Sequence, residues 1–204
     1  MIPRDQIEGR GIRDPRVIAA VRSVPRARFV PDELRAYALD DRPLDIGWGA
    51  TISQPYIVAA MTEFLDVCPV HKVLEVGTGS GYQAAILSQL VHEVCSIEVV
   101  PELGLQATEL LERLGYMNVR VRIGDGYAGW PEDAPFDRII LTAAPPHIPA
   151  ELLHQLAAPG RLVAPLGEPS HQNLFVFDKT ADGRVDSRRI FGVSFVPMVP
   201  GYKP

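Results

Sequence analysis

The stretch Val73-Leu74-Glu75-Val76-Gly77-Thr78-Gly79-Ser80-Gly81-Tyr82 decides the fold of this chain. Its apolar residues suit a strand that is buried on both faces, and the run from Gln83 to Leu90 that follows is typical of a helix. The order strand, glycine turn, helix presents bare backbone and a helix N-terminus to a ligand. We therefore predict a ligand-binding turn; the alternative is a turn that only caps the helix.

The spacing of these glycines distinguishes two kinds of cofactor site. A dinucleotide site carries G-x-G-x-x-G, but Tyr82 stands where the third glycine of that pattern would be. This chain has E-x-G-x-G-x-G instead, beginning at Glu75. The spacing argues against a nicotinamide-dependent oxidoreductase, which remains the alternative from another enzyme class.

Strand and helix patterns alternate along most of the chain and end in a hairpin. This pattern predicts a three-layer α/β fold with a mostly parallel sheet and an antiparallel strand at its far end. The Asp182-Gly183 pair predicts the hairpin turn. We expect strands at 73–76, 94–97, 119–123, 136–141, 161–165, 173–178 and 190–196, helices at 83–90, 101–114 and 149–156, and a turn at Pro159-Gly160.

The N-terminal third reads as short helices that cover a larger core. Asp14 followed by Pro15 predicts a capped helix start, a second short helix is expected over 32–39, and Pro55 opens a third. Between them lies a loop with small hydroxyl side chains, in which Ser53 can either line a site or simply cap the third helix. We expect one domain, with residues 1–66 as helical cover and substrate loop and 67–204 as the α/β core with its C-terminal hairpin.

Composition limits the classes of partner. The net charge of −5 and the isoelectric point near 5.5 argue against binding nucleic acid through a broad basic face. No apolar run is long enough for a membrane helix, and the start of the chain has no apolar signal core. The five histidines and two cysteines show no metal-ligand spacing. We expect a cytoplasmic protein, monomeric, with no metal, membrane or nucleic-acid partner.

Polar residues follow three of the predicted strands and are candidates for ligand contacts. Glu98 ends the second strand, about twenty residues past the glycines, where an acid can accept hydrogen bonds from ribose hydroxyls. Asp125 lies on a glycine-flanked turn after the third strand and can reach an exocyclic amine, or can be only a turn former. Thr142 and the small residues after it leave room for a substrate.

Several segments together resemble one enzyme family. The glycine motif resembles motif I of the S-adenosylmethionine-dependent methyltransferases. The segments Thr51-Ile52-Ser53-Gln54-Pro55-Tyr56 and Phe195-Val196-Pro197-Met198, with the N-terminal Pro25–Pro31, resemble protein-L-isoaspartate O-methyltransferases, and the resemblance covers nearly the whole chain. Two departures are Ala50, where the family often has Gln, and Ala158-Pro159-Gly160, where a paired glycine is common.

The resemblance implies a Rossmann-like class I methyltransferase fold and a reaction. A methyl group passes from S-adenosylmethionine to the α-carboxylate of an L-isoaspartyl residue in an aged protein or peptide, which initiates repair and leaves S-adenosylhomocysteine. Ser53 falls on the position usually given as the active-site serine. The resemblance and the neighbouring positions assign cofactor contacts to Glu75, Gly77, Thr78, Gly79, Glu98, Asp125, Gly126 and Thr142, and substrate contacts to Thr51, Ile52, Gln54, Ala144, Val196 and Pro197.

The chemistry explains why no catalytic His or Lys stands out in the sequence. A carboxylate acceptor, with an ordinary pKa near 4, is already ionised at neutral pH and needs no general base. The enzyme has to align the reactants and exclude water, so we expect Ser53 to orient the carboxylate without becoming a nucleophile. The alternatives are another class I methyltransferase that acts on an RNA base or a small metabolite, and a module that binds the cofactor without catalysis.

Overall fold

Seven strands form one sheet in the computed structural model, which describes residues 1–201. The strand order is β5-β4-β3-β6-β7-β8-β9; β5 to β7 run parallel, and β8 and β9 pair antiparallel. This topology confirms the predicted mostly parallel sheet with an antiparallel end. The strands are β3 (Lys72–Val76), β4 (Glu93–Glu98), β5 (Val119–Ile123), β6 (Phe136–Leu141), β7 (Leu156–Leu166), β8 (Gln172–Lys179) and β9 (Val185–Val193).

The central strands are apolar because both of their faces are covered. Neighbouring side chains of β3, Val73 and Leu74, are both fully buried, although they point to opposite faces of the sheet. Val73 packs with Ile140 of β6 in one apolar cluster, and Leu74 packs with Ile139 in a second cluster. Continuous apolar runs are what a parallel sheet covered on both faces requires.

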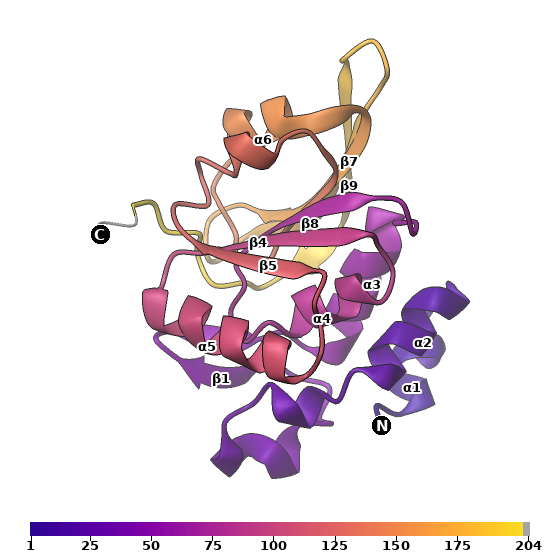
Figure 1. The fold of residues 1–204 in the computed structure, drawn as a ribbon. Coiled ribbons are helices and arrows are strands. Elements are labelled where there is room, and N and C mark those ends of the chain that lie inside the picture. Colours follow the sequence, from indigo (N-terminus) through magenta and orange to yellow (C-terminus); the bar gives the residue numbers. More distant parts are fainter. Residues whose placement is uncertain (202–204) are drawn as a thin grey trace.

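Helices cover the two faces unequally. Figure 1 shows α3, α4 and α5 on one side of the sheet and α6 on the other. The short helix α4 has every residue buried, because it lies between the sheet and the N-terminal segment. The bounds are α3 (Pro55–Leu65), α4 (Tyr82–Ser88), α5 (Pro101–Arg113) and α6 (Ala150–Gln155), with a 3₁₀ helix at Pro131–Asp133.

The N-terminal segment packs on the helices of the first face, as predicted. The side chain of Asp14 caps α2 by accepting a 2.8 Å hydrogen bond from the backbone N–H of Arg16. Ile7 and Val17 lie in the same apolar cluster as the buried residues of α3 and α4. The segment contains α1 (Arg4–Ile7), α2 (Pro15–Ser23), 3₁₀ helices at Glu8–Arg10, Arg26–Arg28 and Asp32–Tyr37, and the hairpin of β1 (Leu44–Gly47) and β2 (Ala50–Ile52).

Two predicted boundaries were wrong. The turn expected at Pro159-Gly160 lies inside β7, which begins at Leu156 and shifts register against β6 near this point. An irregularity of this kind lets a strand contain a proline and a glycine. The return strand expected at 190–196 is β9, at 185–193, because an edge strand with an exposed face can be built from polar residues.

Within residues 1–201, no helix has both the length and the apolar character needed to cross a membrane.

Candidate active site

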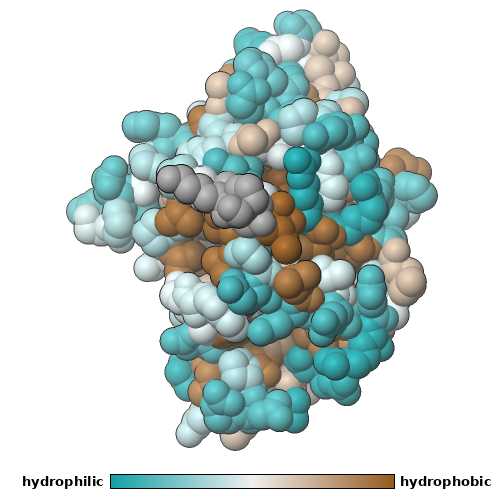
Figure 2. Space-filling view, turned by 60° about the vertical axis from the view of Figure 1, so that its left-hand side comes forward, coloured by the Kyte–Doolittle hydropathy of each residue, from teal (hydrophilic) through white to brown (hydrophobic). Residues whose placement is uncertain are grey.

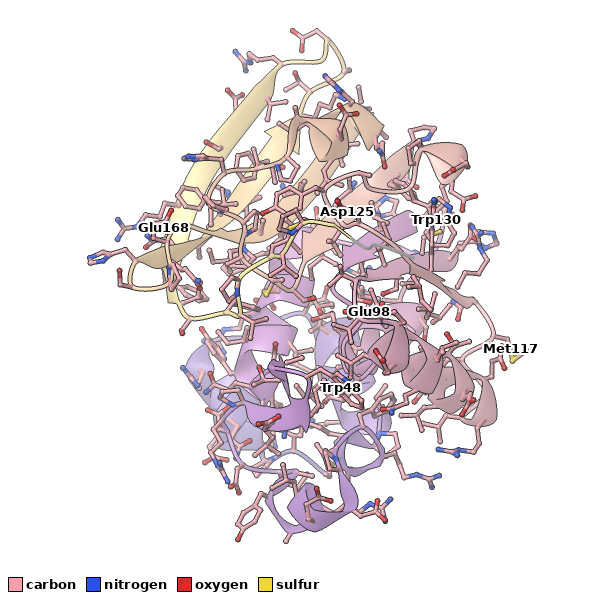
Figure 3. The ribbon with its side chains drawn as sticks, turned by 90° about the vertical axis from the view of Figure 1, so that its left-hand side faces the viewer. Trp48, Glu98, Met117, Asp125, Trp130 and Glu168 are labelled. Carbon is pink, nitrogen blue, oxygen red and sulfur yellow. The ribbon has the colours of Figure 1, made fainter. Side chains whose placement is uncertain are left out.

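A cavity of about 240 Å³ lies where β3, β4 and β6 end. Its walls come from the glycine turn after β3, the β1–β2 hairpin and the segment Val196–Val199. Figure 3 places Glu98 between Trp48 and Asp125 on this face of the molecule, and Figure 2 shows apolar surface gathered in a band across the middle of a similar view. The carboxyl ends of parallel strands are the usual place for a ligand in this kind of sheet.

The glycine turn is held against the end of β4. The backbone N–H groups of Gly77 and Thr78 both donate to the carbonyl of Ile97, at 2.8 and 3.1 Å. Gly77 has φ +104°, and a Cβ built there would collide with the hydroxyl of Thr142. Glycine is therefore required at this position, both for the backbone conformation and for the close approach of β6.

A buried polar network lies behind the turn. Ser96 Oγ is 2.5 Å from Glu75 Oε2 and 2.6 Å from Thr78 Oγ1, so the three side chains form a hydrogen-bonded chain from β3 through β4 to the turn. Burial raises the pKa of Glu75 to about 8, and the nearby Glu98 adds to the rise. The Glu75 carboxyl group is therefore mostly neutral at pH 7.

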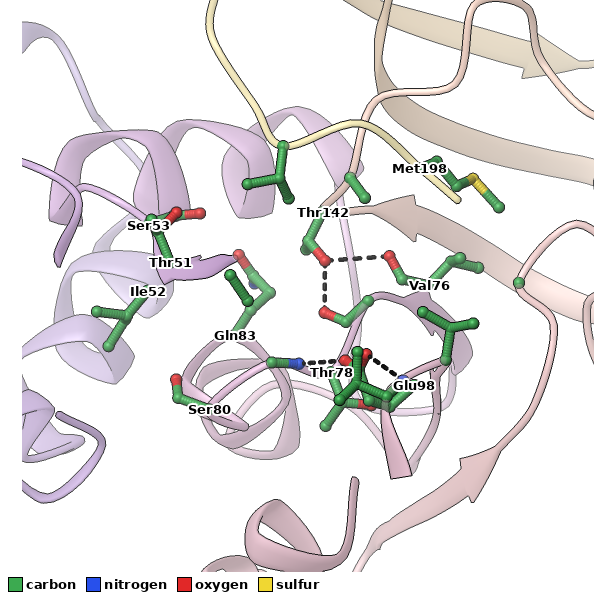
Figure 4. A pocket seen from close by; sticks show the side chains of 18 of the residues that line it. Thr51, Ile52, Ser53, Val76, Thr78, Ser80, Gln83, Glu98, Thr142 and Met198 are labelled. Atoms are coloured by element: carbon green, nitrogen blue, oxygen red, sulfur yellow. Dashed lines mark hydrogen bonds between the residues drawn. The ribbon is translucent and has the colours of Figure 1, made fainter. Parts of the chain in front are cut away.

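Glu98 and Thr142 fix the two ends of the turn from inside the cavity. The carboxylate of Glu98 accepts hydrogen bonds from Gly79 N at 2.7 Å and from Val100 N at 3.0 Å, and its residue is only 6% exposed. The hydroxyl of Thr142 donates to the carbonyls of Gly77 at 2.5 Å and Val76 at 3.0 Å. Figure 4 shows these contacts on one side of the pocket.

The opposite side of the pocket carries hydroxyl groups without protein partners. Figure 4 shows Thr51 and Ser53 across the pocket from Thr78 and Glu98. Neither hydroxyl makes a hydrogen bond within the described part of the chain, and the N-cap of α3 is Gln54, with no side-chain bond. Ser53 is therefore not a capping residue, and its hydroxyl is free to contact a ligand.

A second, more open groove of about 930 Å³ joins the cavity at this side. Four residues line both the cavity and the groove: Thr51, Ser53, Thr142 and Val196. The outer walls of the groove contain the aromatic residues Tyr56, Phe191 and Phe195. The site thus has an enclosed part under the glycine turn and an open part that can receive a larger molecule.

Most of the predicted site residues meet at this cavity. On the cofactor side they are Gly77, Thr78, Gly79, Glu98, Gly126 and Thr142, and on the substrate side Thr51, Ile52, Ser53, Val196 and Pro197. Gln54 lines the groove instead, with its amide donating to the carbonyl of Asp41 at 2.9 Å.

Three predicted residues line neither the cavity nor the groove. Glu75 lies behind the turn, where Thr78 and Ser96 separate it from the pocket. Asp125 accepts hydrogen bonds from the backbone N–H groups of Tyr127 at 2.8 Å and Gly201 at 3.0 Å, so its carboxylate holds the C-terminal segment. Ala144 is buried in a backbone bridge with Pro197, and its neighbour Ala143 lines the cavity in its place.

Other lining residues were missed by the sequence analysis. Gln83 is a buried amide on the largely apolar helix α4. Thr62 accepts a 2.9 Å hydrogen bond from the amide nitrogen of Gln83, and Figure 4 shows the Gln83 side chain pointing into the pocket. A buried amide on an apolar helix face was a readable signal. The missed residues nearest the turn and hairpin are Trp48, Ser80, Tyr82, Gln83, Val99 and Val100, and those of the C-terminal segment are Met198 and Val199.

No group of three His, Cys, Asp or Glu side chains within residues 1–201 is arranged to hold a metal ion. The ionisable side chains that line the cavity are those of Glu98 and Tyr82, and burial raises the pKa of the Tyr82 hydroxyl. Glu98 is already engaged by backbone N–H groups. The cavity is thus built to bind and orient, and it offers no evident general base.

Comparisons with known proteins agree with this geometry. The model of the protein-L-isoaspartate(D-aspartate) O-methyltransferase family matches residues 4–203. Protein-L-isoaspartate O-methyltransferase 2 of Nitrosococcus oceani is 57% identical over 93% of this chain and 87% of its own length. The corresponding protein of a Picosynechococcus species is 54% identical over 96% of this chain and 87% of its own length.

Two solved structures share the fold along nearly the whole chain. A protein-L-isoaspartate O-methyltransferase superposes with a TM-score of 0.86 at 31% identity, covering 96% of this chain; this chain spans 64% of that one. A putative protein-L-isoaspartate O-methyltransferase from Plasmodium falciparum, in complex with S-adenosyl-L-homocysteine, superposes with a TM-score of 0.82 at 25% identity over 94% of both chains. The chain belongs to the protein-L-isoaspartate(D-aspartate) O-methyltransferase family.

Proposed function

We propose that this protein transfers a methyl group from S-adenosylmethionine to the α-carboxylate of L-isoaspartyl residues in damaged proteins and peptides. The observation that carries the proposal is the junction of two unlike surfaces in one cavity. The glycine turn and Glu98 form one wall, and the free hydroxyl of Ser53 forms the other, at the mouth of an open groove. The family membership supports the same reaction.

The residues at the glycine turn fit the cofactor. Each oxygen of Glu98 accepts one backbone N–H and keeps acceptor capacity for ribose hydroxyls. Gly77 and Gly79 leave backbone without side chains beside the cavity, and Val99 and Val100 add apolar wall. When bound, S-adenosylmethionine supplies an electrophilic methyl group on a sulfonium. Gly126 and Thr142 complete this wall, whereas Glu75 supports it from behind.

Ser53 orients the acceptor. A hydroxyl donor can hold one oxygen of a carboxylate and leave the other directed at the methyl group, so the acceptor is aligned before reaction. Because the carboxylate is ionised at neutral pH, the absence of a free base among the described lining residues does not impede the reaction. Apolar walls around the reacting groups favour the reaction further, since charge is neutralised as the sulfonium and the carboxylate combine.

The open groove receives the rest of the peptide. Thr51 and Val196 lie at the border of cavity and groove, and Gln54 lines the groove, where they can contact the chain on either side of the isoaspartyl residue. Ile52 and Pro197 line the cavity near Ser53 and limit its width.

We further propose that the chain works as one unit, a monomer in the cytoplasm, on proteins instead of nucleic acids. The apolar cluster shared by the N-terminal segment and the sheet supports a single domain. Both cysteines are free, which suits a reducing compartment, and the net charge of −5 disfavours nucleic acid.

The test is transfer of a labelled methyl group to an isoaspartyl peptide and to its normal aspartyl twin of identical sequence. We expect label on the isoaspartyl peptide alone, as a base-labile ester. A tRNA preparation and a small carboxylic acid serve as controls for the alternative methyltransferases and should stay unlabelled. Equal labelling of the two peptides, or none of either, would contradict the proposal.

A further inference from the structure

Arg26 is a buried cation without an acidic partner. The residue is only 2% exposed, and its guanidinium forms no ion pair with any described residue. It donates instead to three backbone carbonyls: Ala38 O at 2.6 Å, Ser53 O at 3.0 Å and Arg42 O at 3.2 Å. Burying an unpaired charge costs free energy, so close packing alone does not explain why Arg26 is buried.

The three carbonyls belong to separate segments that meet behind the acceptor wall, which is the side of the cavity with Thr51 and Ser53 that is proposed to hold the methyl acceptor. Ala38 follows the 3₁₀ helix Asp32–Tyr37, Arg42 precedes the β1–β2 hairpin, and Ser53 precedes α3. The planar guanidinium, with five N–H donors, is the side chain best suited to hold carbonyls in different directions at once. A further hydrogen bond links two of the same segments: the side-chain amide of Gln54 donates to the carbonyl of Asp41 at 2.9 Å.

The backbone of Ser53 is thus fixed, whereas its hydroxyl is free. Since no described residue bonds that hydroxyl, its position depends on how the backbone is held. The guanidinium also lies over the ring of Tyr82, 5.9 Å from its centroid, and Tyr82 lines the same cavity. Arg26 therefore sits directly behind the acceptor wall without reaching the cavity itself.

We infer that Arg26 is a positioning residue for methyl transfer, which acts by clamping the backbone of Ser53 so that the hydroxyl aims the acceptor carboxylate. The inference rests on the proposed function and adds a residue of the N-terminal cover to it. The cover then has two tasks: it shields the helices of one face, and it sets the geometry of the acceptor wall.

A double-mutant cycle with Arg26→Lys and Ser53→Ala tests this inference. Lysine keeps the charge, but its compact ammonium cannot reproduce the planar fork whose separate nitrogens reach the three carbonyls, so kcat/KM for the isoaspartyl peptide should fall about 10-fold, mainly through kcat. In the Ser53→Ala background the same change should cost less than about 2-fold, because the group that it positions is gone. Affinity for S-adenosylhomocysteine, measured by calorimetry, should stay within about 2-fold.

Arg28→Lys is the matched control, since Arg28 lies on the same 3₁₀ helix but is exposed; it should leave every readout unchanged. Arg26→Gln provides a second variant and should show the same dependence on Ser53. Equal losses in both backgrounds, cofactor affinity lost in step with activity, or loss of folding in both Arg26 variants would overturn the inference. Failure of the wild-type enzyme to label the isoaspartyl peptide would instead overturn the proposed function.

Discussion

The two walls of the cavity are built in opposite ways. The donor wall is the side of the cavity that is proposed to hold the methyl donor. Its polar side chains form hydrogen bonds within the protein: Glu98 to Gly79, Thr142 to Gly77 and Thr78 to Ser96. On the acceptor wall the hydroxyls of Thr51 and Ser53 make no bond to any described residue. There the backbone is held, from behind, by Arg26.

The difference matches the two molecules that each wall would meet. The methyl donor is the same in every turnover. A wall whose polar side chains are already hydrogen-bonded within the protein has a fixed shape and can hold this molecule with little reorganisation. The acceptor arrives on many different peptides, and free hydroxyls beside an open groove can adapt to them. The comparison predicts that changes to the donor wall affect stability and cofactor affinity, whereas changes to the acceptor wall affect turnover and peptide affinity.

The largest effect should come from the buried carboxyl group behind the donor wall. Because the pKa of Glu75 rises from 4.5 to about 8 on folding, the folded protein keeps a proton that the unfolded chain loses. Its contribution to stability is fully present below pH 4.5 and falls with increasing pH, by about 1.4 kcal/mol per pH unit, until about pH 8. Glu75→Gln stays neutral and should lack this dependence.

Urea unfolding of both proteins between pH 5 and pH 9 measures the effect. We expect the curve of the wild-type protein to fall relative to that of Glu75→Gln as the pH rises. Glu109→Gln, on the exposed side of α5, is the control and should follow the wild type. Parallel curves for wild type and Glu75→Gln would show that Glu75 titrates normally and that the donor wall has no neutral acid behind it.

Gly77→Ala should have the next largest effect. The added methyl group would collide with the hydroxyl of Thr142, at a residue whose φ of +104° is unfavourable for alanine. We expect affinity for S-adenosylhomocysteine to fall about 100-fold, measured by calorimetry. Gly11→Ala has a similar φ of +100° but open space around its Cβ, so it should lose some stability and no affinity. If Gly77→Ala kept its affinity for S-adenosylhomocysteine, the turn would not have the fixed shape that is assigned to the donor wall.

Thr51→Val should have the smallest effect, because it removes one hydroxyl of the acceptor wall and keeps the shape of the side chain. We expect KM for the isoaspartyl peptide to rise about 2- to 10-fold, with kcat and cofactor affinity unchanged. A loss of cofactor affinity in steady-state and calorimetric measurements would place Thr51 on the donor wall instead.

Residues of both walls were predicted from sequence, but the clamp behind the acceptor wall was not. Glycine spacing and an acid at the end of the next strand are local patterns, and both Gly77 and Glu98 lie where they were expected. The clamp by Arg26 joins segments 12 to 27 residues away, which no local pattern reports. The sequence Arg26-Ala27-Arg28 does not tell which of its two arginines is buried.

The C-terminal segment explains, in the same way, why Asp125 and Ala144 do not line the cavity. The chain after β9 returns to the end of β6, where Ala144 exchanges backbone hydrogen bonds with Val196 and Met198 at 2.9 Å. This pairing buries Ala144, and the Gly201 N–H engages the carboxylate of Asp125. A sequence pattern places Asp125 at the edge of the sheet, but it cannot show that another part of the chain has already bound its carboxylate.

The contrast between the two walls is tested most directly by measuring Ser53→Ala and Glu98→Gln in the same two assays. Calorimetry with S-adenosylhomocysteine reports the donor wall, and kcat/KM for the isoaspartyl peptide at saturating cofactor reports the acceptor wall. Ser53→Ala should lose about 10- to 100-fold in kcat/KM with cofactor affinity within about 2-fold, and Glu98→Gln should lose about 10- to 100-fold in cofactor affinity. If Ser53→Ala instead lost cofactor affinity in step with its activity, the separation of donor and acceptor walls would be contradicted.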